Sequence, residues 1–216
     1  MELLNDVDVR VLGALIEKEL TTPEHYPLSL NALVNACNQS SNRDPVVRFD
    51  EATVKAGVDR LRKHSLVRSI QRADARVMKY MHLTHETMSL ERPEIAALCV
   101  LMLRGPQTVG EIRTRSGRLF EFPSLEEVEA TLDRLIISSP SPLVTRLERQ
   151  PGQKEARYAH LLSGEVTVAP QLAADARADV PAELDRYAAL EGVVESLRRE
   201  VADLRAEVGE LRRLFE

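Results

Sequence analysis

The sequence predicts a mainly α-helical protein of the α+β class, with small β-hairpins: two tandem winged helix-turn-helix domains followed by a C-terminal coiled-coil helix. Three observations predict this fold. A helix-and-hairpin pattern occurs twice, and its closing signatures, which begin at Lys79 and Arg157 and read basic-Tyr-x-His-Leu, lie 78 positions apart. Two further helical patterns precede each copy. A heptad of apolar residues closes the chain.

Composition and charge limit the class of protein. The chain has 216 residues, enough for two small domains and an extension. We assign them as winged-helix domain 1 (residues 1–87), winged-helix domain 2 (88–164), a linker (165–182) and a coiled-coil helix (183–216). No apolar run approaches the roughly 18 residues that span a membrane, and the N-terminus lacks a signal-peptide pattern. We therefore expect a cytoplasmic protein without membrane contact.

The first domain is predicted from helical spacing and cap residues. Its expected elements are helix 8–19, helix 30–37, helix 50–64 and wing strands 66–70 and 77–83, with the wing tip at 71–76. Ser29 and Asp50 are the expected N-caps of the second and third helices, because their side chains can accept hydrogen bonds from the first turn. Cys37 and Cys99 fall inside helical apolar patterns, which favours buried, reduced thiols over a disulfide.

The second domain carries clearer local signals. Pro93 suits the first turn of its first helix. The sequences Thr108-x-x-Glu111 and Ser124-x-x-Glu127 are typical capping boxes for the next two helices. Residues 150–153 (Gln-Pro-Gly-Gln) suit a type II turn between two strands. The third helix is expected to bury Leu125, Val128, Leu132 and Leu135.

The C-terminal heptad predicts a parallel homodimer. The predicted dimerisation residues are Leu190, Val194, Leu197, Val201, Leu204, Val208 and Leu211. Val at position a with Leu at position d favours two parallel strands, and the flanking charges alternate in sign as interhelical pairs would require. Packing of this helix on its own domain is the alternative.

Charge is unevenly distributed along the chain. Residues 1–164 hold 22 Lys/Arg and 22 Asp/Glu, so the net charge of −5 belongs to the tail. A neutral core argues against strong, indiscriminate DNA binding but leaves room for a local basic patch. The candidate DNA-binding residues are Lys55, Arg60, Arg62, Lys63, Arg68, Arg72, Arg76 and Lys79. With Asp59 and Asp74, these eight cations give residues 55–79 a net charge of +6, which suits phosphate contacts. The alternative is that the cations only keep an exposed helix face in contact with solvent.

The second domain differs at the equivalent helix, which exposes acidic residues that phosphate would repel. They are Glu126, Glu127, Glu129 and Asp133. This helix is therefore expected to face a protein partner or to serve the structure alone. A basic cluster at Arg113, Arg115 and Arg118 precedes it and could flank a bound duplex.

Catalysis and metal binding have little support. His82 and His160 recur at equivalent strand positions, which favours a shared structural role over an active site. His82-x-x-His85 has no Cys or carboxylate pair to complete a metal site, so we predict no catalytic residue, no metal and no cofactor. The polar connector is either a candidate functional loop or a network of caps and turns. Its residues are Asn38, Gln39, Asn42, Arg43 and Asp44.

Several motifs resemble one bacterial family. They include Gly13–Glu19 (GALIEKE), Thr21–Ser29 (TTPEHYPLS), Asn42–Pro45 (NRDP), Leu103–Thr108 (LRGPQT) and Arg157–Gly164 (RYAHLLSG). These are similar to the YceH family, a domain-of-unknown-function group with tandem winged helices and a C-terminal coiled coil. The resemblance implies that fold and a bacterial cytoplasmic setting, and it carries no catalytic residues. The segment after His82 is shorter than the resemblance implies, which favours close contact between the domains.

The leading functional hypothesis is a non-enzymatic, dimeric DNA-binding protein, either a transcriptional regulator or a nucleoid-associated factor. Helix 50–64 and its wing would contact DNA. The alternative is a protein-interaction scaffold built on tandem winged helices, without DNA contact, as in the kleisin partners of bacterial chromosome condensation. A third class is a module that senses a small ligand between the domains.

Overall fold

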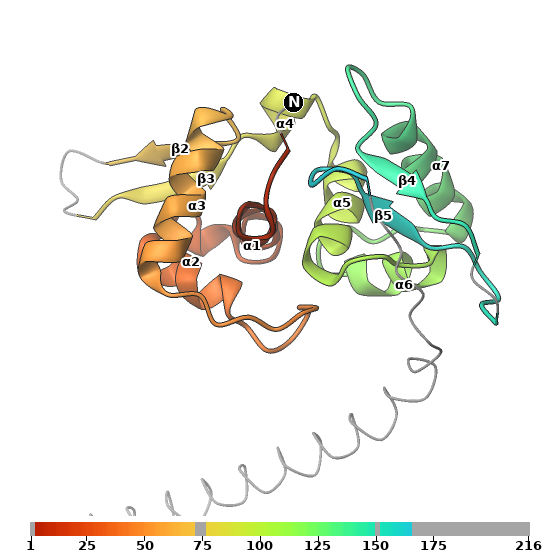
Figure 1. Ribbon diagram of the computed structural model, residues 1–216, viewed down its shortest axis with the longest axis horizontal. Helices are drawn as coiled ribbons and strands as arrows, with labels where there is room; N and C mark the ends of the chain where they lie inside the picture. The colour runs from red at the N-terminus through yellow and green to blue at the C-terminus, as the bar shows by residue number, and fades with distance from the viewer. Residues whose placement is uncertain (1–2, 72–76, 150–151, 166–216) are drawn as a thin grey trace, which may run out of the picture. The chain divides into compact units, whose positions relative to one another are not determined.

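The computed structural model describes residues 3–71, 77–149 and 152–165 of the chain. Within these ranges the fold contains seven α-helices and five short strands, and both sheets are antiparallel (Figure 1). The prediction of a mainly helical α+β fold with small hairpins is therefore confirmed. The predicted coiled coil, its linker, the first wing tip and the start of the turn at 150–153 lie outside the described residues. None of the helices in the described part is long and apolar enough to cross a membrane.

The first half of the molecule runs from α1 to β3. Its elements are α1 (Asp6–Thr21), the 3-10 turn Pro23–His25, β1 (Leu28–Ser29), α2 (Leu30–Cys37), α3 (Glu51–Lys63), β2 (Val67–Ile70) and β3 (Lys79–His82). The three strands form one antiparallel sheet in the order β1-β3-β2. Tyr80 of β3 is paired with Leu28 on one side and with Ser69 on the other.

Cap residues fix where the first three helices begin. The Asn5 side chain accepts from the Asp8 backbone N–H and the Asp8 side chain accepts from Asn5, so the two complete a capping box. Ser29 and Asp50 accept from the backbone N–H groups of Ala32 and Thr53, as predicted for the N-caps of α2 and α3.

The second half repeats this order from α5 to β5. Its elements are α5 (Arg92–Arg104), α6 (Val109–Ser116), α7 (Leu125–Ile136), β4 (Val144–Arg146) and β5 (Tyr158–His160). An isolated bridge pairs Gln107 with Tyr158, in the place that β1 takes beside β3 in the first half. The capping box at Thr108 is complete. At Ser124 the hydroxyl accepts from Glu127, as expected, but among the described residues the returning bond of the box is not formed.

Helix α1 lies at the centre of the described molecule. Every residue from Asp8 to Glu17 is buried, because α2 and α3 pack on one side of the helix and α5 on the other (Figure 1). The Cys99 thiol of α5 donates to the Gly13 carbonyl of α1 at 3.5 Å, and one continuous apolar core includes residues of both halves. The close contact expected from the short connecting segment is thus present. Cys37 and Cys99 are both buried and free, as predicted.

Three local expectations were wrong. Helix α1 extends past the predicted 8–19, to Asp6 and Thr21, because its N-cap is Asn5. A short helix, α4 (Thr84–Met88), was not predicted and occupies the connection between the halves. Leu125 was expected in the core but is 44% exposed, because it is the first residue of α7 and precedes the buried stripe that begins at Val128.

Candidate nucleic-acid interface

Two cations on the outer face of α3 share one carboxylate. Lys55 Nζ lies 2.5 Å from Asp59 Oδ2, and Arg62 lies 3.6 Å from Asp59 Oδ1. The hydrogen bond from Lys55 holds the pKa of Asp59 below its usual value. Both cations remain about half exposed, at 44% and 48% of their side chains, so these surface pairs restrain them weakly. Asp59 therefore lowers the positive charge of this face without removing it.

Arg60 has a different role from its neighbours. Its guanidinium contacts Asp8 through Nε at 2.9 Å and through a terminal nitrogen at 2.8 Å. The Asp8 side chain is only 3% exposed and belongs to the capping box of α1. Because an unpaired buried carboxylate is costly, Arg60 anchors the end of α3 to the start of α1. It was predicted as a DNA contact, and the structure shows that it also has this internal partner.

The remaining predicted cations of this surface are exposed. Lys63 ends α3, Arg68 lies on β2 and Lys79 lies on β3, and all three side chains face solvent. Arg72 and Arg76 lie outside the described residues. Arg48, just before α3, is also exposed and was not predicted. It lies seven positions upstream of Lys55 and precedes the helix that was predicted to contact DNA.

The equivalent surface of the second half is acidic. Helix α7 exposes all four carboxylates predicted for it, Glu126, Glu127, Glu129 and Asp133. The hydroxyl of Ser124 holds the pKa of Glu126 below its usual value, so this carboxylate is ionised at neutral pH. Two apolar side chains flank the acidic face, Leu125 at 44% and Ile137 at 79% exposure. The two halves thus present outer helices of opposite character.

The connector between α2 and α3 is built around Arg43, whose side chain is fully buried. Arg43 makes two hydrogen bonds to the Glu17 carboxylate, at 2.9 Å and 2.6 Å. It also donates to the Ala36 carbonyl at 2.8 Å and to the Gln39 side chain at 3.0 Å. A guanidinium paired and hydrogen-bonded in this way is a structural anchor, and it is not available to an external ligand.

Other residues of the connector are also held internally. The Asn38 side chain makes a two-way bond with the backbone of Phe49, at 2.7 Å in each direction. Asn42, at a positive φ of 58°, accepts from Arg104 of the second half at 2.5 Å. The backbone N–H of Asp44 donates to the Leu103 carbonyl at 2.8 Å. These contacts match the capping-and-turn interpretation and tie the connector to α5.

His82 belongs to a buried polar cluster within the first half. Its Nδ1 accepts the Thr84 backbone N–H at 3.2 Å, and its Nε2 lies 2.5 Å from Glu19 Oε2. The Tyr26 hydroxyl accepts the His82 backbone N–H at 2.6 Å. The His82 hydrogen bond lowers the pKa of Glu19, and burial raises that of Tyr26. The cluster joins α1, β3 and the loop before β1.

His160, at the corresponding position of β5, has different surroundings. Burial lowers its pKa to about 4, so the imidazole is neutral at pH 7. The two histidines thus share a strand position without sharing a site. In the described part of the chain, no group of three or more His, Cys, Asp or Glu side chains could hold a metal ion.

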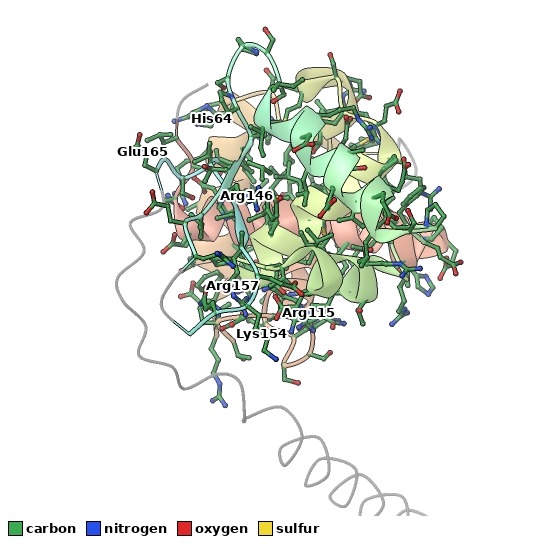
Figure 2. The ribbon with its side chains drawn as sticks, turned by 90° about the vertical axis from the view of Figure 1, so that its right-hand side faces the viewer. His64, Arg115, Arg146, Lys154, Arg157 and Glu165 are labelled. Carbon is green, nitrogen blue, oxygen red and sulfur yellow. The ribbon has the colours of Figure 1, made fainter. Side chains whose placement is uncertain are left out.

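The basic residues of α6 take part in a third network. Arg115 contacts Gln107 and lies 3.8 Å from Glu111, while Arg157 lies 3.0 Å from the same carboxylate. Figure 2 labels Arg115 and Arg157, which approach the same Glu111 carboxylate. Arg113 donates to the carbonyls of Phe122 and Pro123. Arg118 is exposed at the end of this region.

Comparison with known proteins identifies the family. The family model "Protein of unknown function, DUF480" matches residues 4–153. A UPF0502 protein of Pelobacter propionicus is 52% identical over 219 residues, covering 99% of both chains. Those of Opitutus terrae and Aliivibrio salmonicida are 52% and 45% identical, covering 92% and 98% of this chain and 84% and 99% of their own. The chain therefore belongs to the UPF0502 family, also designated DUF480, which is the family of YceH and confirms the resemblance of its motifs.

Proposed function

We propose that each half is a winged helix-turn-helix module and that the protein binds DNA through the first of them. The order of elements supports the first part of the proposal. Each half contains three helices followed by an antiparallel strand pair, and a short pairing segment lies between its first two helices. In this class of domain the third helix enters the major groove and the hairpin contacts the backbone. Helix α3 and the β2–β3 hairpin would take these roles.

The observation that carries the proposal is the charge of that surface. Arg62, Lys63, Arg68 and Lys79 are exposed on α3 and its hairpin. Asp59 lies among them, and Glu51 is exposed in the first turn of α3. The corresponding helix of the second half exposes carboxylates instead. Cations that neutralise phosphates release counterions, which supplies most of the free energy of sequence-independent DNA binding. Of the two outer helices, α3 is the one whose charge suits this interaction.

Small side chains on α3 suit a close approach to DNA. The outer face of α3 presents the small side chains Ala52 and Ala56 between its charged residues. Small residues allow a helix to approach base edges closely, and an alanine methyl can contact a thymine methyl. We propose that phosphate contacts supply part of the affinity for DNA. A second copy of the module, held by the predicted C-terminal coiled coil, would supply the remaining affinity. A dimeric, cytoplasmic regulator or nucleoid-associated factor fits this arrangement.

Fluorescence anisotropy with random-sequence duplex DNA across a salt series tests the proposal. We expect binding that weakens steeply with salt. A variant with Arg62, Lys63, Arg68 and Lys79 all changed to Ala should bind more weakly, and its log–log salt slope should fall by up to about 4, roughly one for each phosphate that is no longer neutralised. The matched control changes Arg146 and Arg149 to Ala on the second hairpin and should retain the parental slope. Absence of binding at low salt, or an equal weakening in both variants, would reject DNA contact by the first half.

A second candidate function, a protein-interaction scaffold, is favoured by one observation. Leu125 and Ile137, at the two ends of α7, are exposed beside an acidic face. Apolar residues ringed by charge are common at sites of protein association. Changing Leu125 and Ile137 to Ser should abolish co-purification of such a partner while leaving DNA binding unchanged. The variant with Arg62, Lys63, Arg68 and Lys79 changed to Ala should lose DNA binding and still co-purify with the partner.

A further inference from the structure

A cleft of about 380 Å³ lies between the two halves. Its walls are the C-terminal part of α1 and the connector after α2 on one side, and α5 with the end of α6 on the other. Small-molecule sites occupy clefts of about 300–1,000 Å³ and often lie where two modules meet. The cleft shares no lining residue with α3 or the β2–β3 hairpin, so it is separate from the proposed DNA surface.

The walls of the cleft are positively charged. Four cations line it, Lys18 from the first half and Arg104, Arg115 and Arg118 from the second. Glu17 is the one carboxylate in the lining, and its two oxygens already accept hydrogen bonds from Arg43. Arg115 lies 3.8 Å from Glu111, outside the lining, so the charge that the cleft presents to a ligand is reduced but remains positive. The four cations come from α1, α5, α6 and the turn after α6, and an anion bound among them would relieve their mutual repulsion.

Part of the cleft lining is apolar. Cys99, Val100, Leu103 and Leu119 form it, and all four are buried. Ion pairs are stronger beside such a surface than in bulk water, because the local dielectric constant is lower. Burial raises the pKa of the Cys99 thiol, so this group stays protonated and contributes packing to the lining without acting as a nucleophile.

The walls of the cleft also carry threonine hydroxyl groups, which can accept hydrogen bonds from a ligand. The hydroxyls of Thr21, Thr22 and Thr114 each donate to a backbone carbonyl four residues earlier on their own helix. Toward a ligand these oxygens can therefore act only as acceptors. Hydroxyl groups on the ligand would satisfy them, while the cations would bind its charged end.

We propose that this cleft binds a small phosphate-bearing metabolite that also carries hydroxyl groups. Phosphate suits the site because guanidinium groups bind its oxygens through paired hydrogen bonds, and Lys18 adds a point charge. Lys18 and Arg118 are the groups best placed to bind the ligand first. Lys18 lies 3.8 Å from the Glu17 carboxylate, which Arg43 also holds. Arg118 is exposed at the mouth. Arg104 and Arg115 already contact Asn42 and Gln107, which positions them in the walls.

The position of the cleft gives the ligand contacts with both halves. It would contact α1 and the connector on one side and α5 and α6 on the other. Binding would consequently stabilise the contact between the halves, by a free energy that rises with the logarithm of the ligand concentration once that concentration exceeds Kd. The cleft and the α3 surface share no residue, so variants of one leave the side chains of the other in place.

Isothermal titration calorimetry of the full chain with inorganic pyrophosphate, at constant ionic strength, tests the proposal. We expect saturable binding at one site per chain. The variant Lys18→Met/Arg118→Met keeps the aliphatic stems and removes the charges, and it should lower the affinity at least about tenfold. The matched control Arg62→Ala/Lys63→Ala removes two cations from α3 and should bind pyrophosphate as the parent does. Circular dichroism would verify that both variants are folded.

Three outcomes would overturn the assignment. The first is no saturable heat up to about 10 mM pyrophosphate, a concentration far above the dissociation constants of specific sites. The second is an equal loss of affinity in the cleft variant and the α3 control, which would mean diffuse attraction to surface cations. The third is displacement of pyrophosphate by duplex DNA in the parent chain, which would assign the cleft to a nucleic-acid surface.

Discussion

At the scale of single residues, Arg60 and Arg62 lie two positions apart on α3 and differ in the burial of the carboxylates with which they pair. Arg60 pairs with Asp8, whose side chain is 3% exposed, whereas Arg62 pairs loosely with the half-exposed Asp59. An ion pair with a buried member resists removal of one partner, because the other is left without its counter-charge. An exposed pair contributes little to stability, since water solvates both groups.

We expect Arg60→Ala to lower the free energy of unfolding by about 2–4 kcal/mol, because it leaves Asp8 buried with only its capping hydrogen bonds. The matched change Arg62→Ala should cost less than about 1 kcal/mol. Urea denaturation followed by circular dichroism measures both. If both variants are destabilised by less than about 1 kcal/mol, Arg60 does not anchor α3 and returns to the set of residues available for DNA.

The sequence alone predicts that these arginines lie on the surface of a basic helix, but it does not predict their ion-pair partners. Helical periodicity shows which face of a helix is polar. It does not reveal that Asp8, 52 positions earlier, lies beneath Arg60. The same limit applies to Arg43 and Glu17, whose pairing depends on how the connector folds over α1. The sequence thus predicted the group of basic residues that forms the candidate surface. Which of them pair with buried carboxylates could be learned only from the tertiary structure.

At the scale of secondary-structure elements, local signals predicted most boundaries. Ser29, Asp50 and Thr108 cap the helices that their sequences indicated, because capping depends on residues within one turn. Helix α4 was missed because five residues are too few to show a helical period. The packing of α1 against α5 was also not predicted in detail. Both helices show apolar patterns, but a pattern does not name the partner that covers it.

Gly13 shows how closely α1 and α5 approach. A Cβ atom at this position would lie 2.9 Å from Leu103 Cδ2 and 3.1 Å from Leu103 Cγ. We expect Gly13→Val to lower the free energy of unfolding by about 1–3 kcal/mol, since buried Leu103 would have to shift. The control is Gly110→Ala on α6, where the nearest atom to a new Cβ lies 4.0 Å away. It should be neutral or stabilising by up to about 1 kcal/mol. Equal effects in thermal melts would show that the helix contact tolerates extra volume.

At the scale of the whole molecule, the described residues belong to one compact unit whose core is continuous across both halves. Helix α1 is buried from both sides, so neither half can lose it without exposing apolar surface. Hydrogen bonds reinforce this contact, from Asp44 to Leu103 and from Leu4 to Leu162. A shared central helix couples the stability of the halves, because its unfolding removes packing from both at once.

Native-state hydrogen exchange can measure this coupling. We expect the amides in the middle of α1 and of α5 to exchange with the same free energy of opening, because each helix is the other's packing surface. Gly13→Val should lower both values by the same amount, whereas Gly110→Ala should lower neither. The contrary result is α5 remaining protected under conditions in which α1 exchanges. In that case the second half would keep its structure without α1, and a ligand in the cleft would act on two separately stable bodies instead of one cooperative core.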